Sequence, residues 1–262
     1  MSFNDKKPKL LIIGAAKCGT STISDLLVNS GLSHGLHKEP NILNMQTEDV
    51  INAYNKHYKS TKSDTLLFDA STSYTKKPYY NAAAKNAKYI LGDELKIIYC
   101  FRDPLKRAIS HVKYDMWRKW PRGARDLSNL KYTYFSKYYY QISEWLKYYD
   151  SNNFFYINID EFNRDHKIII EKLSKFIGHQ IVYKKLESNS SKSQININII
   201  KWGKFFGLLN LYRLLPVTTR LMVRNFLPKS KQYSYNPTEE EISKFKMSIK
   251  NDYSNFLKIT KR

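Results

Sequence analysis

A turn rich in small residues stands between an apolar run and a helix-forming segment, and it carries groups suited to binding an anion. Residues 14–22 read Gly-Ala-Ala-Lys-Cys-Gly-Thr-Ser-Thr. Small side chains let backbone N–H groups close around an anion, and the following helix adds the positive end of its dipole. The turn follows the nucleotide-triphosphate pattern G-x-x-x-x-G-K-[ST] at Gly14, Gly19 and Ser21, but a threonine stands at position 20.

The lysine of this turn is Lys17, three residues earlier than in the triphosphate pattern. There the lysine serves the β- and γ-phosphates and the hydroxyl holds Mg²⁺. A donor with one 5′-phosphate and a sulfuryl group has no γ-phosphate, and the earlier lysine can stabilise charge on the bridging oxygen as the sulfuryl group leaves. Taken alone, the turn could also be an ordinary strand–turn–helix junction with a surface lysine.

A second candidate anion site begins at Arg102, where another apolar run ends in Arg-Asp-Pro-Leu-Lys-Arg-Ala-Ile-Ser (102–110). Pro104 suits the first turn of a helix, where a missing N–H costs nothing. Ser110 lies about two helical turns beyond Arg102, so both can face one pocket. An arginine fork with a serine hydroxyl can clamp a monophosphate. The alternative is a helix cap with Arg102 paired to a nearby acid.

Candidate bases stand in the segment His37-Lys38-Glu39-Pro40. A carboxylate or an imidazole within hydrogen-bonding reach of an acceptor hydroxyl can take its proton. Glu39 is the first candidate and His37 the second, although Glu39 could equally be a solvated loop acid. Lys38 and Asp69 are candidates for contact with the acceptor. Asp69 stands at the end of an apolar run, and open α/β folds bind ligands at such strand ends. The alternative is that Asp69 only caps the end of the strand.

Four apolar runs supply the strands that would position these residues, at 9–14, 65–69, 95–101 and 153–159. Their composition is typical of buried parallel strands. Helical patterns alternate with them, at 20–29, 48–58, 79–89, 104–117, 132–149 and 161–177. The alternation predicts an α/β protein of three layers, a P-loop-like fold in which helices cover both faces of a central parallel sheet.

The C-terminal part, residues 186–262, is predicted to be a helical and basic extension of a single domain that spans 1–262. Helices are expected at 198–215 and 217–226, and a last helix begins at Thr238, which forms a capping box with Glu241. Residues 192–231 mix lysine, arginine and aromatic side chains, and no acid stands between Glu187 and Glu239. This stretch could bind an anionic glycan, rest on an anionic membrane surface, or pack as core helices with a solvated basic face.

These motifs together resemble the PAPS-dependent sulfotransferase family, whose donor is 3′-phosphoadenosine 5′-phosphosulfate. The turn at 17–22 is similar to the family's 5′-phosphosulfate loop, and residues 102–110 match its 3′-phosphate motif, R-[DN]-P-x-x-R-x-x-S, at every fixed position. Lys38-Glu39-Pro40 resembles the segment that holds the base in the carbohydrate branch, of the heparan-sulfate type. That branch, together with the expected soluble build, suggests a bacterial member. Residues 1–185 would then form the PAPS-binding core.

The resemblance assigns roles to individual residues. It implies that the donor's 5′ end is bound by residues of the first turn and its 3′-phosphate by residues of the second motif: Lys17, Cys18, Gly19, Thr20, Ser21, Thr22, Arg102 and Ser110. Lys17 would stand on the sulfuryl-bearing side, Arg107 would fix the loop, and Glu39 would act as base. His37 is the alternative base, because another branch uses histidine. The chain departs from the family at Ala70 and Thr72, where lysine and proline are frequent.

The implied activity is in-line transfer of a sulfuryl group from PAPS to a hydroxyl or amine of a carbohydrate or glycolipid, with PAP (3′-phosphoadenosine 5′-phosphate) as product. Two alternatives stay open. A P-loop small-molecule kinase would use ATP, but its loop lysine is replaced by Thr20. A non-catalytic protein that binds anionic glycan or nucleic acid would tolerate changes at Lys17 and Glu39. No recognition motif supports nucleic acid as the partner.

Composition fits these expectations. The 262 residues include 44 Lys and Arg against 23 Asp and Glu, a net charge of +21, which attracts anionic partners. The two cysteines suggest no disulfide framework and the six histidines lack ligand spacing, so a reducing compartment and no metal are expected. The apolar run 10–13 is too short for a signal peptide or a membrane span. We expect a cytoplasmic protein, with peripheral contact at the inner face of the membrane left open, as is the oligomeric state.

Overall fold

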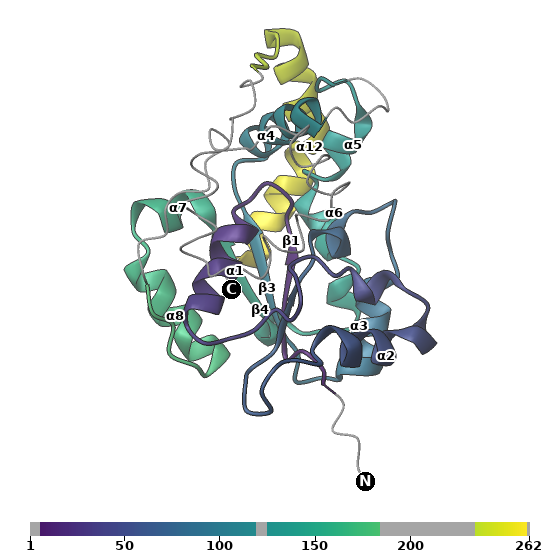
Figure 1. Ribbon diagram of the computed structural model, residues 1–262. Helices are drawn as coiled ribbons and strands as arrows, with labels where there is room; N and C mark the ends of the chain where they lie inside the picture. Colours follow the sequence, from purple (N-terminus) through teal and green to yellow (C-terminus); the bar gives the residue numbers. More distant parts are fainter. Residues whose placement is uncertain (1–5, 119–124, 184–233, 261–262) are drawn as a thin grey trace, which may run out of the picture.

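A four-stranded parallel sheet forms the centre of the molecule (Figure 1). The computed structural model describes residues 6–118, 125–183 and 234–260. The strands are β1 (Leu10–Gly14), β2 (Phe68–Ala70), β3 (Lys96–Phe101) and β4 (Phe154–Asn158), in the order β2-β1-β3-β4. All pairs are parallel, so the strands end at one common edge, and β1 lies directly beside β3. The predicted α/β fold with a central parallel sheet is confirmed.

Helices follow each strand and flank the sheet. In Figure 1, α7 and α8 lie on one side of the view and α2 and α3 on the other, while α4 and α5 lie beyond the sheet next to α12. The helices are α1 (Thr20–Asn29), α2 (Thr47–His57), α3 (Ala83–Leu91), α4 (Pro104–Arg118), α5 (Leu130–Tyr134), α6 (Tyr138–Ile142), α7 (Ile159–Arg164), α8 (Lys167–Ile177) and α12 (Glu239–Thr260). Short 3-10 turns are η1 (Ile42–Asn44), η2 (Thr72–Thr75), η3 (Trp145–Lys147) and η4 (Ser151–Asn153).

The predicted helix 132–149 is wrong as one element, because it is divided into α5, α6 and η3. The break follows from the carbonyl of Tyr132. The guanidinium of Arg107 donates to this carbonyl at 2.8 Å, and the hydroxyl of Ser136 donates to it at the same distance. The amide of Ser136 bonds Thr133 instead, which tightens the last turn and ends α5.

The predicted helix 161–177 is divided into α7 and α8 in the same way. Asp165 is extended between them, and its carboxylate accepts a hydrogen bond from the amide of Lys167 at 3.1 Å. An aspartate side chain that bonds an amide two residues ahead competes with helix continuation. The two helices therefore meet at an angle set by this turn.

Two further elements differ in extent. The strand expected at 65–69 begins only at Phe68, because Ser33 pairs with the preceding segment: its amide donates to Leu66 and its carbonyl accepts from Phe68. The helix expected at 79–89 begins at Ala83, after a turn in which the amides of Tyr79 and Tyr80 donate to the carbonyl of Lys76.

The helix α12 closes one face of the sheet near the end of the chain. The capping box expected at its start is present, since the Glu241 amide donates to the Thr238 hydroxyl at 3.2 Å and the Thr238 amide to the Glu241 carboxylate at 2.8 Å. Phe256 of α12 is fully buried, and its ring contacts those of Tyr99 and Phe101 on β3 at 5.8 and 5.0 Å between centroids. The last helix therefore belongs to the core of the sheet.

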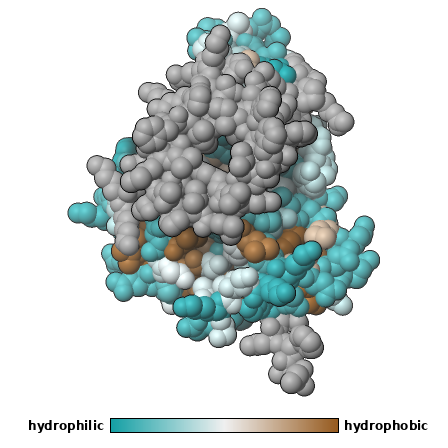
Figure 2. All heavy atoms as spheres, viewed as in Figure 1, coloured by the Kyte–Doolittle hydropathy of each residue, from teal (hydrophilic) through white to brown (hydrophobic). Residues whose placement is uncertain are grey.

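The side of the molecule in Figure 2 is mostly hydrophilic where it is coloured, and a band of hydrophobic side chains crosses it. None of the helices in the described ranges combines the length and apolar character needed to cross a membrane. The helices expected at 198–215 and 217–226, and the basic stretch 192–231, lie outside the described residues.

Candidate active site

The turn between β1 and α1 is fixed by contacts with β3. The Ala15 amide donates to the Cys100 carbonyl at 2.6 Å, and the Cys18 amide returns to the Ala15 carbonyl at 3.1 Å. Lys17 and Gly19 have φ angles of 71° and 76°. A Cβ at Gly19 would lie 2.4 Å from the side chain of Ile159, so glycine is required there. Gly19 caps α1 without a side-chain hydrogen bond, which leaves the first amides of the helix open to an anion.

The ammonium of Lys17 lies over an aromatic ring beside this turn. Its Nζ is 4.2 Å from the centroid of Tyr114, a cation–π contact with α4. Burial lowers the pKa of Lys17 to about 8, and the negative charge of Asp115 opposes that shift. Burial disfavours the charged form of Lys17, and a nearby anionic ligand would stabilise that form.

Cys18 joins the first turn to the second motif. Its Sγ lies 3.5 Å from the Tyr138 hydroxyl, which in turn lies 3.1 Å from the Arg102 carbonyl and donates to it. Burial raises the pKa of the Cys18 thiol to about 11, so the thiol is neutral at physiological pH. Its side chain therefore fixes the turn, and contact with a ligand is left to the Cys18 backbone.

Arg102 lies at the end of β3 and is held by an acid from the neighbouring strand end. Its Nη2 donates to the Asp160 carboxylate at 3.2 Å, and the Nζ of Lys106 lies 3.7 Å from the other oxygen. The Nε of Arg102 is buried without a hydrogen-bond partner among the residues described. Ser110 is half-buried on α4, the helix that begins two residues after Arg102. The guanidinium thus has donor capacity left for a phosphate.

Arg107 of the second motif is fully buried. Its Nε donates to the Ser136 hydroxyl at 2.8 Å, and its Nη1 lies 3.1 Å from Nδ1 of His111. Burial, followed by the positive charge of Arg107, lowers the pKa of His111 well below its usual value, so this imidazole is neutral. These contacts tie α4 to the α5 segment, as expected of a residue that fixes the loop.

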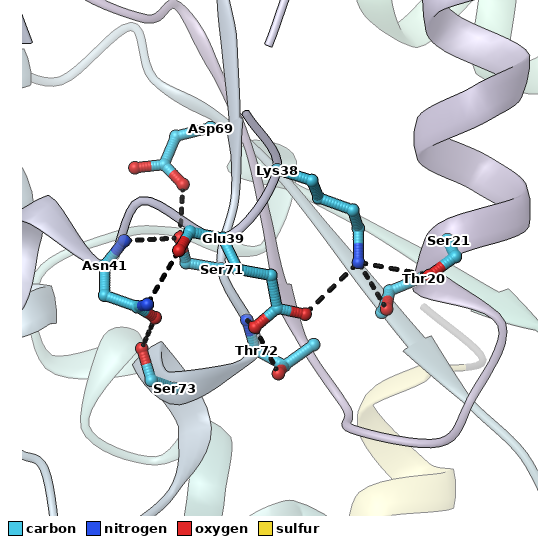
Figure 3. A network of polar contacts seen from close by, with 9 residues as sticks. All are labelled: Thr20, Ser21, Lys38, Glu39, Asn41, Asp69, Ser71, Thr72 and Ser73. Carbon is cyan, nitrogen blue, oxygen red and sulfur yellow. Dashed lines mark hydrogen bonds and ion pairs between the residues drawn. The ribbon is translucent and has the colours of Figure 1, made fainter. Parts of the chain in front are cut away.

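The carboxylate of Glu39 faces the first turn across Lys38 (Figure 3). The Nζ of Lys38 lies 3.2 Å from Glu39 Oε1, and 3.5 and 3.3 Å from the hydroxyls of Thr20 and Ser21. The second oxygen of Glu39 accepts from the Thr72 hydroxyl at 3.0 Å. The structure therefore brings together the candidate base, a candidate acceptor-binding lysine and the hydroxyls of the first turn.

Asp69 lies behind this cluster with no exposed surface. Its oxygens accept hydrogen bonds from the hydroxyls of Tyr54, Ser71 and Tyr74 at 3.0, 2.6 and 2.5 Å. The expectation that Asp69 contacts the acceptor does not fit this environment, because water and acceptor have no access to its carboxylate. Its surroundings match the alternative, a carboxylate that holds the end of β2.

His37, the alternative base, is exposed. Its imidazole packs edge-on against that of His57, with 5.0 Å between the ring centroids. Within the described part of the chain, the His37 side chain therefore contacts α2, and no contact of it with Glu39 or Lys17 is seen. The geometry therefore favours Glu39.

Three residues near the site were not singled out for it from the sequence. Thr72 holds Glu39, and Asp160 holds Arg102. Lys76 is half-buried after η2; burial lowers its pKa, and the nearby negative charge of Glu39 opposes the shift. Asp160 could have been found, because it follows a strand predicted to end at the same edge as Arg102. Among the residues with described positions, no group of three or more His, Cys, Asp and Glu could hold a metal ion.

A parallel sheet with candidate anion-binding groups after two adjacent strands, and a carboxylate facing them, is the arrangement expected of an α/β enzyme that transfers a group from a nucleotide. The family described as the sulfotransferase domain matches residues 7–198, so the chain belongs to the sulfotransferase family and is an enzyme of that class. No curated protein matches the chain by sequence.

Solved structures of other sulfotransferases resemble this one. The sulfotransferase of Alicyclobacillus acidocaldarius aligns with a TM-score of 0.58 at 18% identity, over 79% of this chain and 94% of its own, and supports the fold. The mouse sulfotransferase SULT7A1, complexed with PAP, aligns with a TM-score of 0.47 at 13% identity, over 96% of this chain and 85% of its own. The sulfotransferase domain of the curacin biosynthetic pathway gives 0.48 at 10% identity, over 94% and 98%.

Proposed function

We propose that this sulfotransferase uses PAPS as donor and transfers the sulfuryl group to a hydroxyl or amine of a carbohydrate or glycolipid, with Glu39 as general base. One observation carries the proposal. The ammonium of Lys38 spans the Glu39 carboxylate and the hydroxyls of Thr20 and Ser21, with contacts of 3.2 to 3.5 Å. A single ammonium group therefore links the candidate base to the turn that would bind the 5′-phosphosulfate.

The residues present fit this donor. The uncapped start of α1, with the hydroxyls of Thr20 and Ser21, offers hydrogen bonds to the 5′-phosphate, and Thr22 follows on the same turn. Lys17 supplies positive charge beside the turn. The Nε of Arg102, which bonds no residue in the part of the chain that the structure describes, and the Ser110 hydroxyl further along α4 offer a site for the 3′-phosphate. The 3′-phosphate distinguishes PAPS from ATP, so the Arg102 site would determine the nucleotide.

The proposed reaction is an in-line displacement at sulfur. The acceptor oxygen or nitrogen forms a bond to sulfur as the bond from sulfur to the bridging oxygen breaks. The acceptor proton passes to Glu39, and the electron pair of the broken bond stays on the 5′-phosphate of PAP. Lys17 would stabilise that developing charge. Lys38 would balance charge on both the base and the donor, because its Nζ contacts Glu39 and the hydroxyls of the first turn.

The acceptor class rests on the resemblance of Lys38-Glu39-Pro40 to the carbohydrate branch. The cytoplasm is the proposed compartment, and both cysteines of the chain are free and buried, which fits reducing conditions.

Calorimetric titration with PAP, run beside ATP with and without Mg²⁺, tests the donor. We expect micromolar binding of PAP that does not depend on metal. A clear preference for Mg²⁺-ATP, or no binding of PAP, would refute the donor assignment.

Turnover with labelled PAPS and a panel of glycan and glycolipid acceptors tests the base. Glu39→Gln should lower kcat by about 10²- to 10⁴-fold, the range typical of general base catalysis, and should leave the Kd for PAP unchanged. Glu171→Gln is the matched control, because Glu171 is exposed on α8, where it pairs with Lys175 at 3.0 Å. Full turnover in Glu39→Gln would remove Glu39 from the mechanism.

A further inference from the structure

The turn that carries Glu39 has an unfavourable backbone conformation. Glu39 and Asn41 have φ angles of 61° and 59°, in the left-handed region that non-glycine residues seldom occupy, and Pro40 between them has no N–H to donate. Such conformations cost on the order of 1 kcal/mol each and persist only where the surrounding structure holds them. The contacts that hold this turn therefore decide where the Glu39 carboxylate lies.

Two hydrogen-bonded relays lead from this turn to one buried carboxylate. The Asn41 amide donates to the Ser71 hydroxyl at 3.0 Å, and that hydroxyl donates to Asp69 Oδ1 at 2.6 Å (Figure 3). The Leu43 amide donates to the Tyr74 hydroxyl at 3.1 Å, which donates to Asp69 Oδ2 at 2.5 Å. Each hydroxyl accepts from the turn because its own proton is directed at Asp69.

We propose that Asp69 is a positioning residue for Glu39: its ionised carboxylate orients the Ser71 and Tyr74 hydroxyls so that they hold the Asn41–Leu43 backbone, and thereby the base, in place. This inference rests on the proposed role of Glu39. It replaces acceptor contact as the function of Asp69.

The donor and acceptor count explains why a carboxylate is needed. Asp69 accepts three hydrogen bonds, from Tyr54, Ser71 and Tyr74, and donates none. An asparagine in its place would present two N–H groups to hydroxyls that already point at it. At least one hydroxyl would have to direct its proton away from residue 69, and a buried O–H would lose its acceptor. A buried donor left unsatisfied costs about as much as a lost hydrogen bond, and the hydroxyl would be free to leave the place where it accepts from the turn.

The electrostatic surroundings agree with this geometry. Burial raises the pKa of Asp69 to about 6, the three hydroxyls oppose that shift, and the charge of Glu39 adds to it. Burial also raises the pKa values of Tyr54 in α2, Tyr58 just after α2 and Tyr74 in η2 well above 10, so these neighbours remain protonated donors. At neutral pH the carboxylate is ionised and the relays are complete.

The chain offers a matched pair of variants. Tyr74→Phe and Tyr54→Phe each remove one buried hydroxyl from Asp69 Oδ2, but the Tyr74 hydroxyl alone of the two accepts from the Glu39 turn. Ser71→Ala removes the other relay. Asp69→Asn disturbs both, and the milder variants keep the test open if it does not fold.

Two quantities are measured for each variant. The first is kcat at pH 8 with saturating PAPS and acceptor, and the second is the Kd for PAP by calorimetry. We expect Ser71→Ala and Tyr74→Phe to lower kcat about ten- to hundredfold, as a base displaced by a fraction of an ångström to about 1 Å would, with the Kd for PAP unchanged. Tyr54→Phe should keep kcat within about threefold of the unaltered enzyme. Added to Glu39→Gln, Ser71→Ala should cause no further loss, because the base it positions is already gone.

If Tyr54→Phe lowered kcat as much as Tyr74→Phe, the inference would be overturned. It would also be overturned if adding Ser71→Ala to Glu39→Gln lowered kcat further. Unchanged kcat in Ser71→Ala and Tyr74→Phe, with Glu39→Gln inactive, would refute the positioning role and leave Glu39 as base. Full turnover in Glu39→Gln would instead refute the proposed function, and the positioning of a base with it.

Discussion

Replacing Arg102 with alanine should separate the two phosphate sites of the proposed donor. The 3′-phosphate is assigned to Arg102, whereas the 5′ end is assigned to the turn before α1. Arg102→Ala should therefore weaken the binding of PAP. The binding of adenosine 5′-phosphate, which lacks the 3′-phosphate, should be nearly unaffected.

The size of the effect follows from the contacts of the guanidinium. Its ion pair with Asp160, at 3.2 Å, joins side chains that are 27% and 29% exposed, so breaking it costs little, about 0–1 kcal/mol. Its buried Nε has no hydrogen-bond partner in the described ranges, and a phosphate would gain charge-assisted hydrogen bonds of about 1.5–3 kcal/mol. The Kd for PAP should rise about 10- to 150-fold, since about 1.4 kcal/mol corresponds to a factor of ten.

Calorimetric titration of both nucleotides into both proteins measures this difference. Lys106→Ala is the charge control, because Lys106 also lies near Asp160, at 3.7 Å, but is largely exposed. It should leave the ratio of the two Kd values nearly constant. If Arg102→Ala weakened adenosine 5′-phosphate as much as PAP, or if Lys106→Ala reproduced its effect, the assignment of the 3′-phosphate to Arg102 would be refuted.

Three further predictions concern charge and packing. Because the pKa of Lys17 is about 8, kcat/KM for PAPS should fall as the pH rises through about 8, while Lys17→Arg should stay flat; a flat profile in the unaltered enzyme would contradict the role of that charge. The pKa of Asp69 is raised to about 6, above its unfolded value, so ionising this buried carboxyl lowers the free energy of unfolding; that cost is absent below about pH 4 and is complete once the pH has risen through 6. Asp69→Asn should remove that dependence from the free energy of unfolding in urea, and unchanged slopes would argue against it. Phe256→Ala should lower the free energy of unfolding by about 3–5 kcal/mol, whereas Met247→Ala, exposed on the same helix, should change it by less than about 0.5 kcal/mol; similar losses would refute the place of Phe256 in the core.

Local patterns were sufficient for the sheet and for the start of the helix that follows each candidate anion site. Helix α1 has the bounds that its pattern predicted, and α4 begins at Pro104 as expected. The capping box at Thr238 also formed, because its partners are three residues apart and need nothing from the rest of the chain.

Breaks caused by distant residues could not be predicted in this way. The helix expected at 132–149 ends where Arg107, from another helix, bonds the Tyr132 carbonyl, and no local pattern reports that contact. The break at Asp165 is different, because aspartate before a helix is a recognisable capping signal that the apolar periodicity on either side concealed.

The candidate site shows the same division. The motifs containing Gly19, Arg102 and Glu39 are contiguous in sequence, so their residues could be nominated directly. The environment of Asp69 could not, because its carboxylate is surrounded by hydroxyls from α2 and η2 that meet only in the folded chain. A polar residue at a strand end fits ligand contact and buried support equally well in sequence, and burial distinguishes them.

The position of α12 in the core bears on how the protein is made. The strands β1 to β4 and both candidate anion-binding motifs leave the ribosome before Phe256, so Tyr99 and Phe101 emerge without the ring that covers them. A nascent chain would therefore hold every proposed catalytic residue while an aromatic face of its sheet is still open to chaperones or to other chains. Release of the last helix, and not synthesis of the motifs, would be the step that turns this polypeptide into an enzyme.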